Sequence, residues 1–538
     1  MKTPISIRLA LAGLLTACAV PEAKQASQID FTPTPAPSSP EAMVVPQGAS
    51  TLQISFADGT KSTTALTANT LYKSGEMKAG QIVDKAGHPL MLSAPVGKSK
   101  AKAKGPFFAN SPDANSLLKI PGAPEGTFYL VTHYEYQPEG PNAEEGQPPV
   151  NLYGQLPAVM NVATLKQSSW GGALSLEKIS NVDMSGIDGL WIPCAGSATP
   201  WNTHLGSEEY EPNAQYFETR ALEPMNLYLG TPGTTAKQGG ANPYRYGYPV
   251  EVKVDAQGNA KAIKHHAMGR IALELFQFMP DNRTAYAGDD GRDTMLLMYV
   301  ADHAGDLSAG TIYGAKWEQI SGEKGGSAHL TWVRLGHASE KEILALIDKG
   351  TSFSDIFEVV APADYDKKKH AGFRPVHVYP GKDEAGDKNE LWYLKLKPGQ
   401  EQAAAFLETR RYAAYLGATV EFTKMEGQTL NARDKKLYTA MSYIEQGMLD
   451  GQNKERPADH IRLAGDAKDH VCGATYETSL AGGQKDSLGQ PINSDWVGVS
   501  MQALVTGGKK PASQTAYGQY DKCDTDKVAN PDNLKFSE

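Results

Sequence analysis

The sequence has few cysteines, no excess of positive charge and no hydrophobic run long enough to cross a membrane. Its 538 residues include only four cysteines, and no CxxC or histidine-rich spacing indicates a structural zinc site. Lysine and arginine number 52 against 61 aspartates and glutamates, giving a net charge of -9, which argues against a nucleic-acid partner. A membrane-spanning helix needs about 20 apolar residues, so any membrane attachment has to come from another feature.

The N-terminus provides such a feature. Positive charge at Lys2 and Arg8 precedes a short apolar run that ends in "LLTAC", which is typical of a secretory signal peptide. Cys18, after small residues, resembles a lipobox cysteine, which becomes lipidated after cleavage; an ordinary signal peptide with an incidental cysteine is the alternative. Ala19 at the next position favours the outer membrane in a Gram-negative host. We therefore expect residues 1–18 to be a lipoprotein signal peptide and the protein to be lipid-anchored in the cell envelope.

The rest of the chain divides by composition. Residues 19–48 are rich in Pro, Ala and Ser without periodicity, which indicates a tether between lipid and globule. Residues 49–538 are expected to form one domain. Three cysteines remain outside the signal peptide, and an oxidising compartment permits a disulfide. Cys472 and Cys523 lie in the same C-terminal region, so we pair them and leave Cys194 free.

Short strand-like runs punctuated by Gly, Asp, Asn and Pro predict an all-β fold. They are "GTFYLVTHYEY", "GLWIPC", "RTAYAG", "TMLLMYVAD", "GTIYGAKW", "HLTWVRL", "LWYLKLK" and "KLYTAMSY". A sandwich, a barrel or a propeller fits this texture, and the length favours a propeller, although no repeat of blade length is visible. Two helices are expected as insertions, one over "SEKEILALIDKG" with a capping box and one over "GQEQAAAFLETRRYAAYLG".

The stretch "WNTHLGSEEYEPN" at residues 201–213 gathers hard oxygen ligands. Glu208, Glu209, Glu211 and Asn213 fall within six residues, and such oxygens are the ligands that calcium prefers. A solvated acidic turn is the alternative interpretation. The stretch therefore predicts a calcium site only if other parts of the chain supply partners.

Four more acidic constellations lie at or near strand-like runs. Glu274 stands out because it lies inside an apolar run, "GRIALELFQF", where an unpaired carboxylate is costly; it is either neutralised, paired with Arg270 or bound to a cation. The other acidic and amide candidates are Glu135, Asp289, Asp290, Glu426, Asp532 and Asn533.

The motif "GLWIPCAGSATPWNTHLGSEE" resembles the signature of the PhoX-type alkaline phosphatase family. The segments "YLVTHYEY", "GRIALE", "YAGDD", "TKMEG" and "NPDNLKF" resemble that family's other motifs in the same order, and the resemblance covers most of residues 65–538. It implies a six-bladed β-propeller whose central channel holds an iron–calcium cluster that hydrolyses phosphate esters. The metal ligands implied are Glu135, Glu208, Glu274, Asp290, Glu426, Asp532 and Asn533.

Three departures from the family pattern bear on activity. Ser207 stands where the family has an iron-binding cysteine before the two glutamates, and serine is a poor ligand for iron compared with thiolate. Lys424 stands where the family has an arginine, and lysine neutralises a phosphoryl group without gripping it bidentately. The chain ends at Glu538, before the family's last strand, which leaves two alternatives: a fragment with an incomplete last blade, or a ring that closes differently.

These features predict a metal-dependent hydrolase of small phosphate monoesters, with Lys424 and Glu208 as catalytic residues. Calcium is the expected cofactor, and iron(III) is in doubt because of Ser207, so a calcium-dominated site with weak phosphatase activity is expected. The alternatives are a non-catalytic calcium-binding propeller that binds a surface partner, and a hydrolase of another ester. The membrane is contacted through the lipid anchor only.

The lipobox assignment is tested by Cys18→Ser. Without a thiol to acylate, the variant should leave the membrane fraction or accumulate as unprocessed precursor, as measured by fractionation and intact mass. Unchanged membrane association of the processed variant would contradict the assignment.

Overall fold

The computed structural model describes residues 25–32, 50–91, 105–136, 152–169, 172–384, 390–449, 460–465, 470–514 and 522–536. Cys18 and the predicted signal peptide lie outside the described residues. Within the described part of the chain, no helix is long and apolar enough to span a bilayer. The chain separates into two compact units, Met1–Tyr72 and Lys73–Glu538, whereas the sequence placed the start of the domain at residue 49.

The first unit contains a small antiparallel sheet. Its strands are β1 (Ala26–Phe31), β2 (Thr51–Phe56) and β3 (Lys61–Ala65), in the order β1-β2-β3. Strand β1 falls inside the predicted tether: its backbone pairs with β2, for example Ile29 with Ile54. The run "ASQIDF" contains Ile and Phe, which favour strands. The prediction missed this strand because the run is short and the residues around it are rich in proline.

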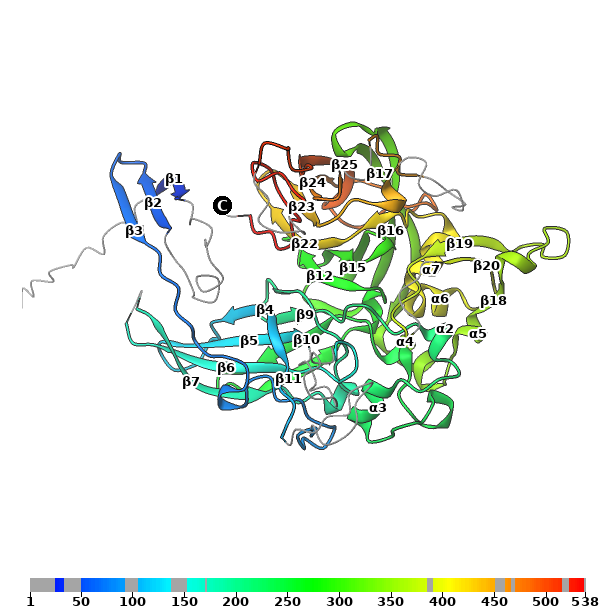
Figure 1. Ribbon diagram of the computed structural model, residues 1–538, viewed down its shortest axis with the longest axis horizontal. Helices are drawn as coiled ribbons and strands as arrows, with labels where there is room; N and C mark the ends of the chain where they lie inside the picture. The colour runs from blue at the N-terminus through cyan, green and yellow to red at the C-terminus, as the bar shows by residue number, and fades with distance from the viewer. Residues whose placement is uncertain are drawn as a thin grey trace, which may run out of the picture. The chain divides into compact units, whose positions relative to one another are not determined.

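The second unit is built from meanders of four antiparallel strands, the unit of a propeller blade (Figure 1). The first meander contains β4 (Asn110–Leu118), β5 (Thr127–Tyr136), β6 (Met160–Gln167) and β7 (Leu174–Asn181). The second contains β8 (Gly196–Ala198), β9 (His204–Gly206), β10 (Val250–Val254) and β11 (Ala260–Lys264).

Two further meanders belong to one nine-stranded sheet. One contains β12 (Leu273–Phe278), β13 (Thr284–Asp289), β15 (Leu297–His303) and β16 (Asp306–Ser321). The other contains β22 (Met425–Asn431), β23 (Lys436–Met441), β24 (Ala474–Ala481) and β25 (Val497–Thr506). Strand β17 (Ser327–Ser339) joins them by pairing with both β16 and β25.

Smaller elements decorate these meanders. Strands β18 (Phe357–Val360), β19 (Arg374–Val378) and β20 (Glu390–Leu396) form one sheet, and β14 (Arg292–Thr294) pairs with β21 (Phe422–Thr423). The α-helices are α2 (Ala214–Phe217), α3 (Glu223–Leu229), α4 (Glu340–Asp348), α5 (Phe353–Ile356), α6 (Glu401–Leu407) and α7 (Thr409–Leu416). Short 3-10 turns, including His266–Met268 and Gln446–Met448, complete the described chain.

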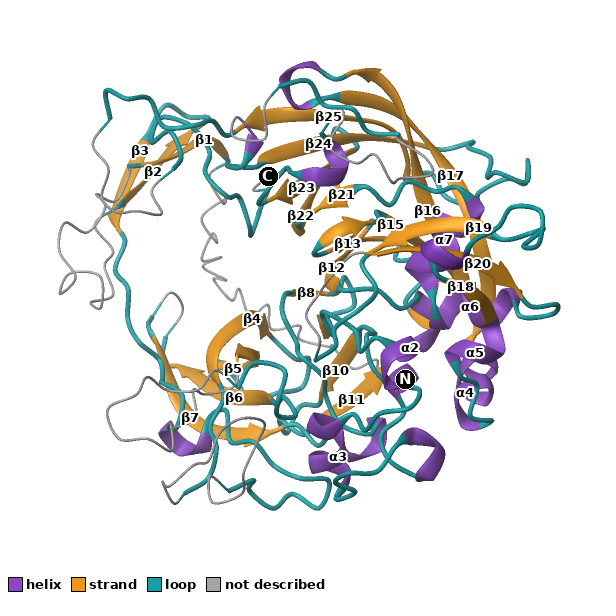
Figure 2. Cartoon of the chain, turned by 45° about the vertical axis from the view of Figure 1, so that its right-hand side comes forward, coloured by secondary structure: helices purple, strands orange, loops and turns teal. Residues whose placement is uncertain are grey.

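The first strand of each meander is its inner strand. Strand β4 contacts β8, β8 contacts β12, and β12 contacts β22, and Figure 2 shows these strands around a common region. Residues far apart in the sequence therefore converge where the inner strands meet. The predicted all-β class with helical insertions is confirmed, and the arrangement is that of a β-propeller; the number of blades stays a prediction.

The local sequence explains most of these elements. Of the eight strand-like runs, seven coincide with strands, and "GLWIPC" does not. Its backbone binds a side chain and not a neighbouring strand: the Trp191 N–H donates to a Glu208 carboxylate oxygen at 2.9 Å. Helix α4 has the predicted capping box between Ser339 and Glu342. The second predicted helix divides into α6 and α7 at Glu408, whose backbone is not helical.

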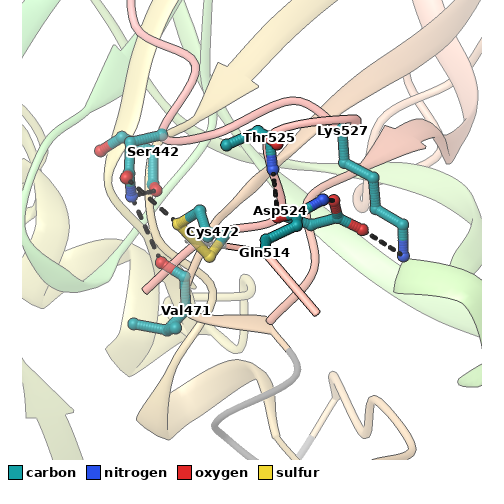
Figure 3. The surroundings of a disulfide bond; sticks show 9 residues. Ser442, Val471, Cys472, Gln514, Asp524, Thr525 and Lys527 are labelled. Carbon is teal, nitrogen blue, oxygen red and sulfur yellow. Dashed lines mark hydrogen bonds and ion pairs between the residues drawn. A yellow bond between two sulfur atoms is a disulfide. The ribbon is translucent and has the colours of Figure 1, made fainter. Parts of the chain in front are cut away.

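The C-terminal segment is fixed to the last meander by a disulfide. Cys472 and Cys523 are bonded, with their Cα atoms 5.7 Å apart, and the buried Cys194 is free. Asn530 reinforces the attachment, because its side chain donates to the backbone oxygens of Ser442 and Val471. Figure 3 shows Ser442 and Val471 beside the disulfide at Cys472. This segment leads directly to Asp532.

Removing the disulfide should destabilise the protein. The two cysteines are 51 residues apart in the sequence, and a disulfide that closes such a loop contributes about 2–4 kcal/mol. Cys472→Ala and Cys523→Ala should therefore each lower the free energy of unfolding in urea by about that amount. The double variant should lose no more than either single variant, and additive losses would contradict a shared bond.

Candidate functional site

Three inner strands carry an acidic residue at a β-bulge. Asp113 on β4, Glu274 on β12 and Glu426 on β22 each lie where the register with the neighbouring strand shifts. A bulge leaves a residue out of the regular pairing and redirects its side chain, and bulges are frequent beside active sites. The three carboxylates are thereby aimed into the region where the inner strands meet.

These carboxylates belong to a set of seven side chains, termed here the ligand cluster. Its members form three overlapping groups, and within each group the candidate ligand atoms lie within 4.8 Å of one another. Cys194 and Glu274 link the groups, with Cys194 Sγ 3.8 Å from Glu274 Oε1. The groups are Asp113, Glu135 and Cys194; Cys194, Glu209 and Glu274; and Glu274, Glu426 and Asp532.

Four predicted ligands lie in the ligand cluster: Glu135, Glu274, Glu426 and Asp532. Glu274 is therefore not paired with Arg270, whose guanidinium instead donates to backbone oxygens such as Tyr246 O at 2.7 Å. Asp532 reaches the cluster because the segment around it lies against Gly427, where an added Cβ would come 2.8 Å from the Asp532 backbone oxygen. Asn533 follows it and is exposed.

The structure corrects the assignment of Glu208. Both of its oxygens are fully engaged away from the cluster: Oε1 accepts from Lys264 Nζ at 2.8 Å, and Oε2 accepts from the backbone N–H of Gly247 at 2.8 Å. Glu208 therefore holds the second meander together, and it belongs to none of the candidate ligand groups among the described residues. Its neighbour Glu209 enters the ligand cluster instead.

Asp290 and Lys424 border the ligand cluster as an ion pair. Lys424 Nζ lies 2.6 Å from Asp290 Oδ2 and 3.3 Å from Glu426 Oε1. Tyr210 donates its hydroxyl to the same Asp290 oxygen. Burial acts to lower the pKa of Lys424, but Asp290, Glu426 and Glu209 raise it above its ordinary value. Lys424 thus keeps its charge beside the cluster, with its side chain 24% exposed.

The carboxylates of the ligand cluster repel one another. Burial raises the pKa of Glu274 well above its ordinary value, and Glu426 and Asp290 raise it further. Burial, with Asp290 and Glu274 beside it, does the same to the pKa of Glu209. The pKa of Glu426 rises to about 7, again chiefly through burial. Ionising these carboxyl groups therefore costs free energy, and a bound cation would offset that cost.

Unpartnered atoms show that the ligand cluster fits a metal. Glu209 Oε2 and Glu274 Oε2 are buried and have no hydrogen-bond partner among the described residues. Burial and the neighbouring Glu209 and Glu274 also raise the pKa of the Cys194 thiol well above its ordinary value. Six carboxylates and a thiol gathered in this way are the donor set of a cation site.

Sequence reasoning missed Asp113, Cys194 and Tyr210 as parts of the site, and it named Glu209 only as one of several acidic residues in the 201–213 stretch. Ser207 stands where the family has a cysteine, but the ligand cluster still contains a thiol, that of Cys194 from the same motif. Ser207 itself donates its hydroxyl to Ala195 O at 2.6 Å. A signal was present in "IPCAG", where a cysteine follows an apolar run that ends without a strand.

The other polar residues of the motifs have structural roles. Arg410 is buried and binds Glu211, with Nη1 to Oε1 at 2.6 Å, and also Asp289. Arg411 pairs with Glu408 in the protein interior. Neither arginine is available to a phosphate group.

Trp201 also has a structural role. Its indole donates to Glu251 Oε1 at 2.8 Å, and its ring packs edge-on against Phe278 with the ring centroids 5.0 Å apart. It is therefore a packing residue and not a substrate platform.

Comparisons with known proteins place the chain in a family. The family model described as "Alkaline phosphatase PhoX" matches residues 166–538. Among solved structures, PhoX of Pseudomonas fluorescens in complex with vanadate is 16% identical over 85% of this chain and 77% of its own, with a TM-score of 0.48. A putative 6-phosphogluconolactonase of Bacteroides uniformis is 12% identical over 77% of this chain and 85% of its own, with a TM-score of 0.22. A search of curated proteins found no match.

The matched region begins within β6 and includes five of the seven members of the ligand cluster; the other two, Asp113 and Glu135, lie on β4 and β5. Because that region is well over half of the chain, the protein belongs to the PhoX alkaline phosphatase family, a metal-dependent group of phosphatase-like hydrolases.

Proposed function

We propose that the protein hydrolyses small phosphate monoesters at the ligand cluster with the help of bound cations. The observation that carries this proposal is the position of Lys424, whose ammonium group lies within 3.3 Å of Glu426 and is held at the edge of a cluster with unpartnered carboxylate oxygens. A cation site next to a fixed positive charge suits a phosphoryl group, which carries negative charge on several oxygens.

The residues of the chain divide the work. Asp113, Glu135, Glu209, Glu274, Glu426 and Asp532 would hold calcium through oxygen, while Cys194 offers the thiolate that suits iron. Cations bound there supply Lewis acidity to the phosphoryl oxygens. Lys424 binds one phosphoryl oxygen as a point charge. Asp290 and Tyr210 orient Lys424, and the φ of 47° at Lys424 shows that its backbone is held in a strained conformation to do so.

We further propose that a lipid on Cys18 anchors the protein in the cell envelope, at the outer membrane. The support is the N-terminal sequence alone, through its apolar run and the small residues before Cys18. The substrate then meets the enzyme outside the cytoplasm, where a disulfide such as Cys472–Cys523 persists.

The cation site is tested by Glu274→Gln. The amide removes one charge from the centre of the ligand cluster, so the variant should lose bound metal and hydrolyse an aryl phosphate at least about 100-fold more slowly. Metal content by mass spectrometry and the rate measured together decide the result. The control is Glu208→Gln, which should lower thermal stability and leave the metal content unchanged. Equal metal loss in both variants would contradict the division made here, and full metal content in Glu274→Gln would contradict the site.

The thiol is tested by Cys194→Ser. If Cys194 binds iron, this variant should lose iron while keeping calcium, because its carboxylates remain. Ser207→Cys should gain no iron, since the side chain at 207 is directed to Ala195 O. Iron loss is read from elemental analysis and from the thiolate-to-iron absorption band. Iron retained in Cys194→Ser, or gained in Ser207→Cys, would contradict the assignment. Calcium bound without hydrolysis of any phosphate ester in the unmodified protein would favour a binding module.

A further inference from the structure

A cavity of about 670 Å³ lies between α3, the chain at Tyr153 and the chain at Lys382. Its volume falls within the range of about 300–1,000 Å³ that is usual for small-molecule sites. Its walls combine apolar and aromatic side chains with charged ones, and the mechanism above makes no use of them. The main apolar lining residues are Tyr153, Trp191, Phe217, Leu222 and Leu227.

Aromatic rings connect this cavity to the ligand cluster. The Tyr153 ring packs edge-on against the Tyr210 ring, with the centroids 6.5 Å apart. Tyr210 in turn donates its hydroxyl to Asp290, and Lys424 Nζ lies 3.5 Å from that hydroxyl oxygen. One ring therefore separates a cavity wall from the lysine that faces the phosphoryl group.

The side chain of Lys382 lies between the cavity and Tyr210. Lys382 Nζ lies over the faces of both rings, 5.2 Å from the Tyr153 centroid and 5.9 Å from the Tyr210 centroid. Its stem passes over Gly154, where an added Cβ would come 2.7 Å from Lys382 Cε, and the φ of +68° there favours glycine. The backbone is thus shaped to leave room for Lys382 between the cavity and Tyr210.

We propose that this cavity holds the alcohol part of the phosphate ester and selects esters whose alcohol carries a planar aromatic ring, such as a nucleoside monophosphate. The inference rests on the proposed phosphatase function. Aromatic walls favour offset or edge-on packing with a flat ring. The carboxylates of Glu223 and Asp383, which also line the cavity, can accept hydrogen bonds from hydroxyl or amino groups. A three-carbon alcohol would leave most of the space unfilled.

The test compares adenosine 5'-monophosphate with glycerol 3-phosphate in the metal-loaded full-length protein. Leu227→Trp fills the cavity, so it should lower the ratio of the two kcat/KM values about tenfold or more. Leu488→Trp, the same change at a side chain that is 69% exposed, should leave the ratio unchanged. Tyr153→Ala removes one wall without filling the space and should lower the ratio in the same direction.

Calorimetry with adenosine, which has no phosphate, provides a readout that does not depend on hydrolysis. Adenosine should bind the unmodified protein and Leu488→Trp, and bind Leu227→Trp about tenfold more weakly or worse. An unchanged ratio in both cavity variants, or adenosine binding that Leu227→Trp does not weaken, would overturn the inference. If neither ester is hydrolysed while adenosine binding still depends on Leu227, the phosphatase function fails and the cavity assignment stands.

Discussion

The repulsion between buried carboxylates is the constraint on which the rest of the structure depends. Glu209, Glu274 and Glu426 approach one another in a place that water reaches poorly, and like charges in such surroundings are costly. Lys424 supplies one fixed positive charge beside Asp290, which is too little for the set. A bound cation removes the repulsion, so the fold carries an energetic penalty that metal binding relieves.

The fold meets this constraint by bringing short pieces of many strands to one place. Bulges in β4, β12 and β22 turn an acidic side chain out of the regular pairing, while the disulfide-bound C-terminal segment adds Asp532. No single segment provides a complete ligand set. A site assembled in this way forms only when the meanders are docked, which couples metal binding to the tertiary structure.

A layer of paired charges surrounds the ligand cluster and keeps other carboxylates out of it. Glu208 binds Lys264, and Arg410 binds both Glu211 and Asp289. These acids are as buried as the ligands, but each has a basic partner and a full set of hydrogen bonds. What distinguishes Glu209 and Glu274 from these structural carboxylates is that each leaves one buried oxygen without a hydrogen-bond partner among the described residues.

The sequence by itself determined the all-β class, most strand positions, the cap of α4 and the family motifs, because these follow from local periodicity, turn residues and short signatures. It also predicted the pairing of Cys472 with Cys523, from their place in one C-terminal region. It also identified Glu274, since a charge inside an apolar run is visible in one dimension. Only the tertiary structure decided which glutamate of the pair at 208–209 faces the cluster and that Cys194 supplies a thiol to it. Those choices depend on bulges and on partners such as Lys264 that lie far along the chain, and strand periodicity does not encode either.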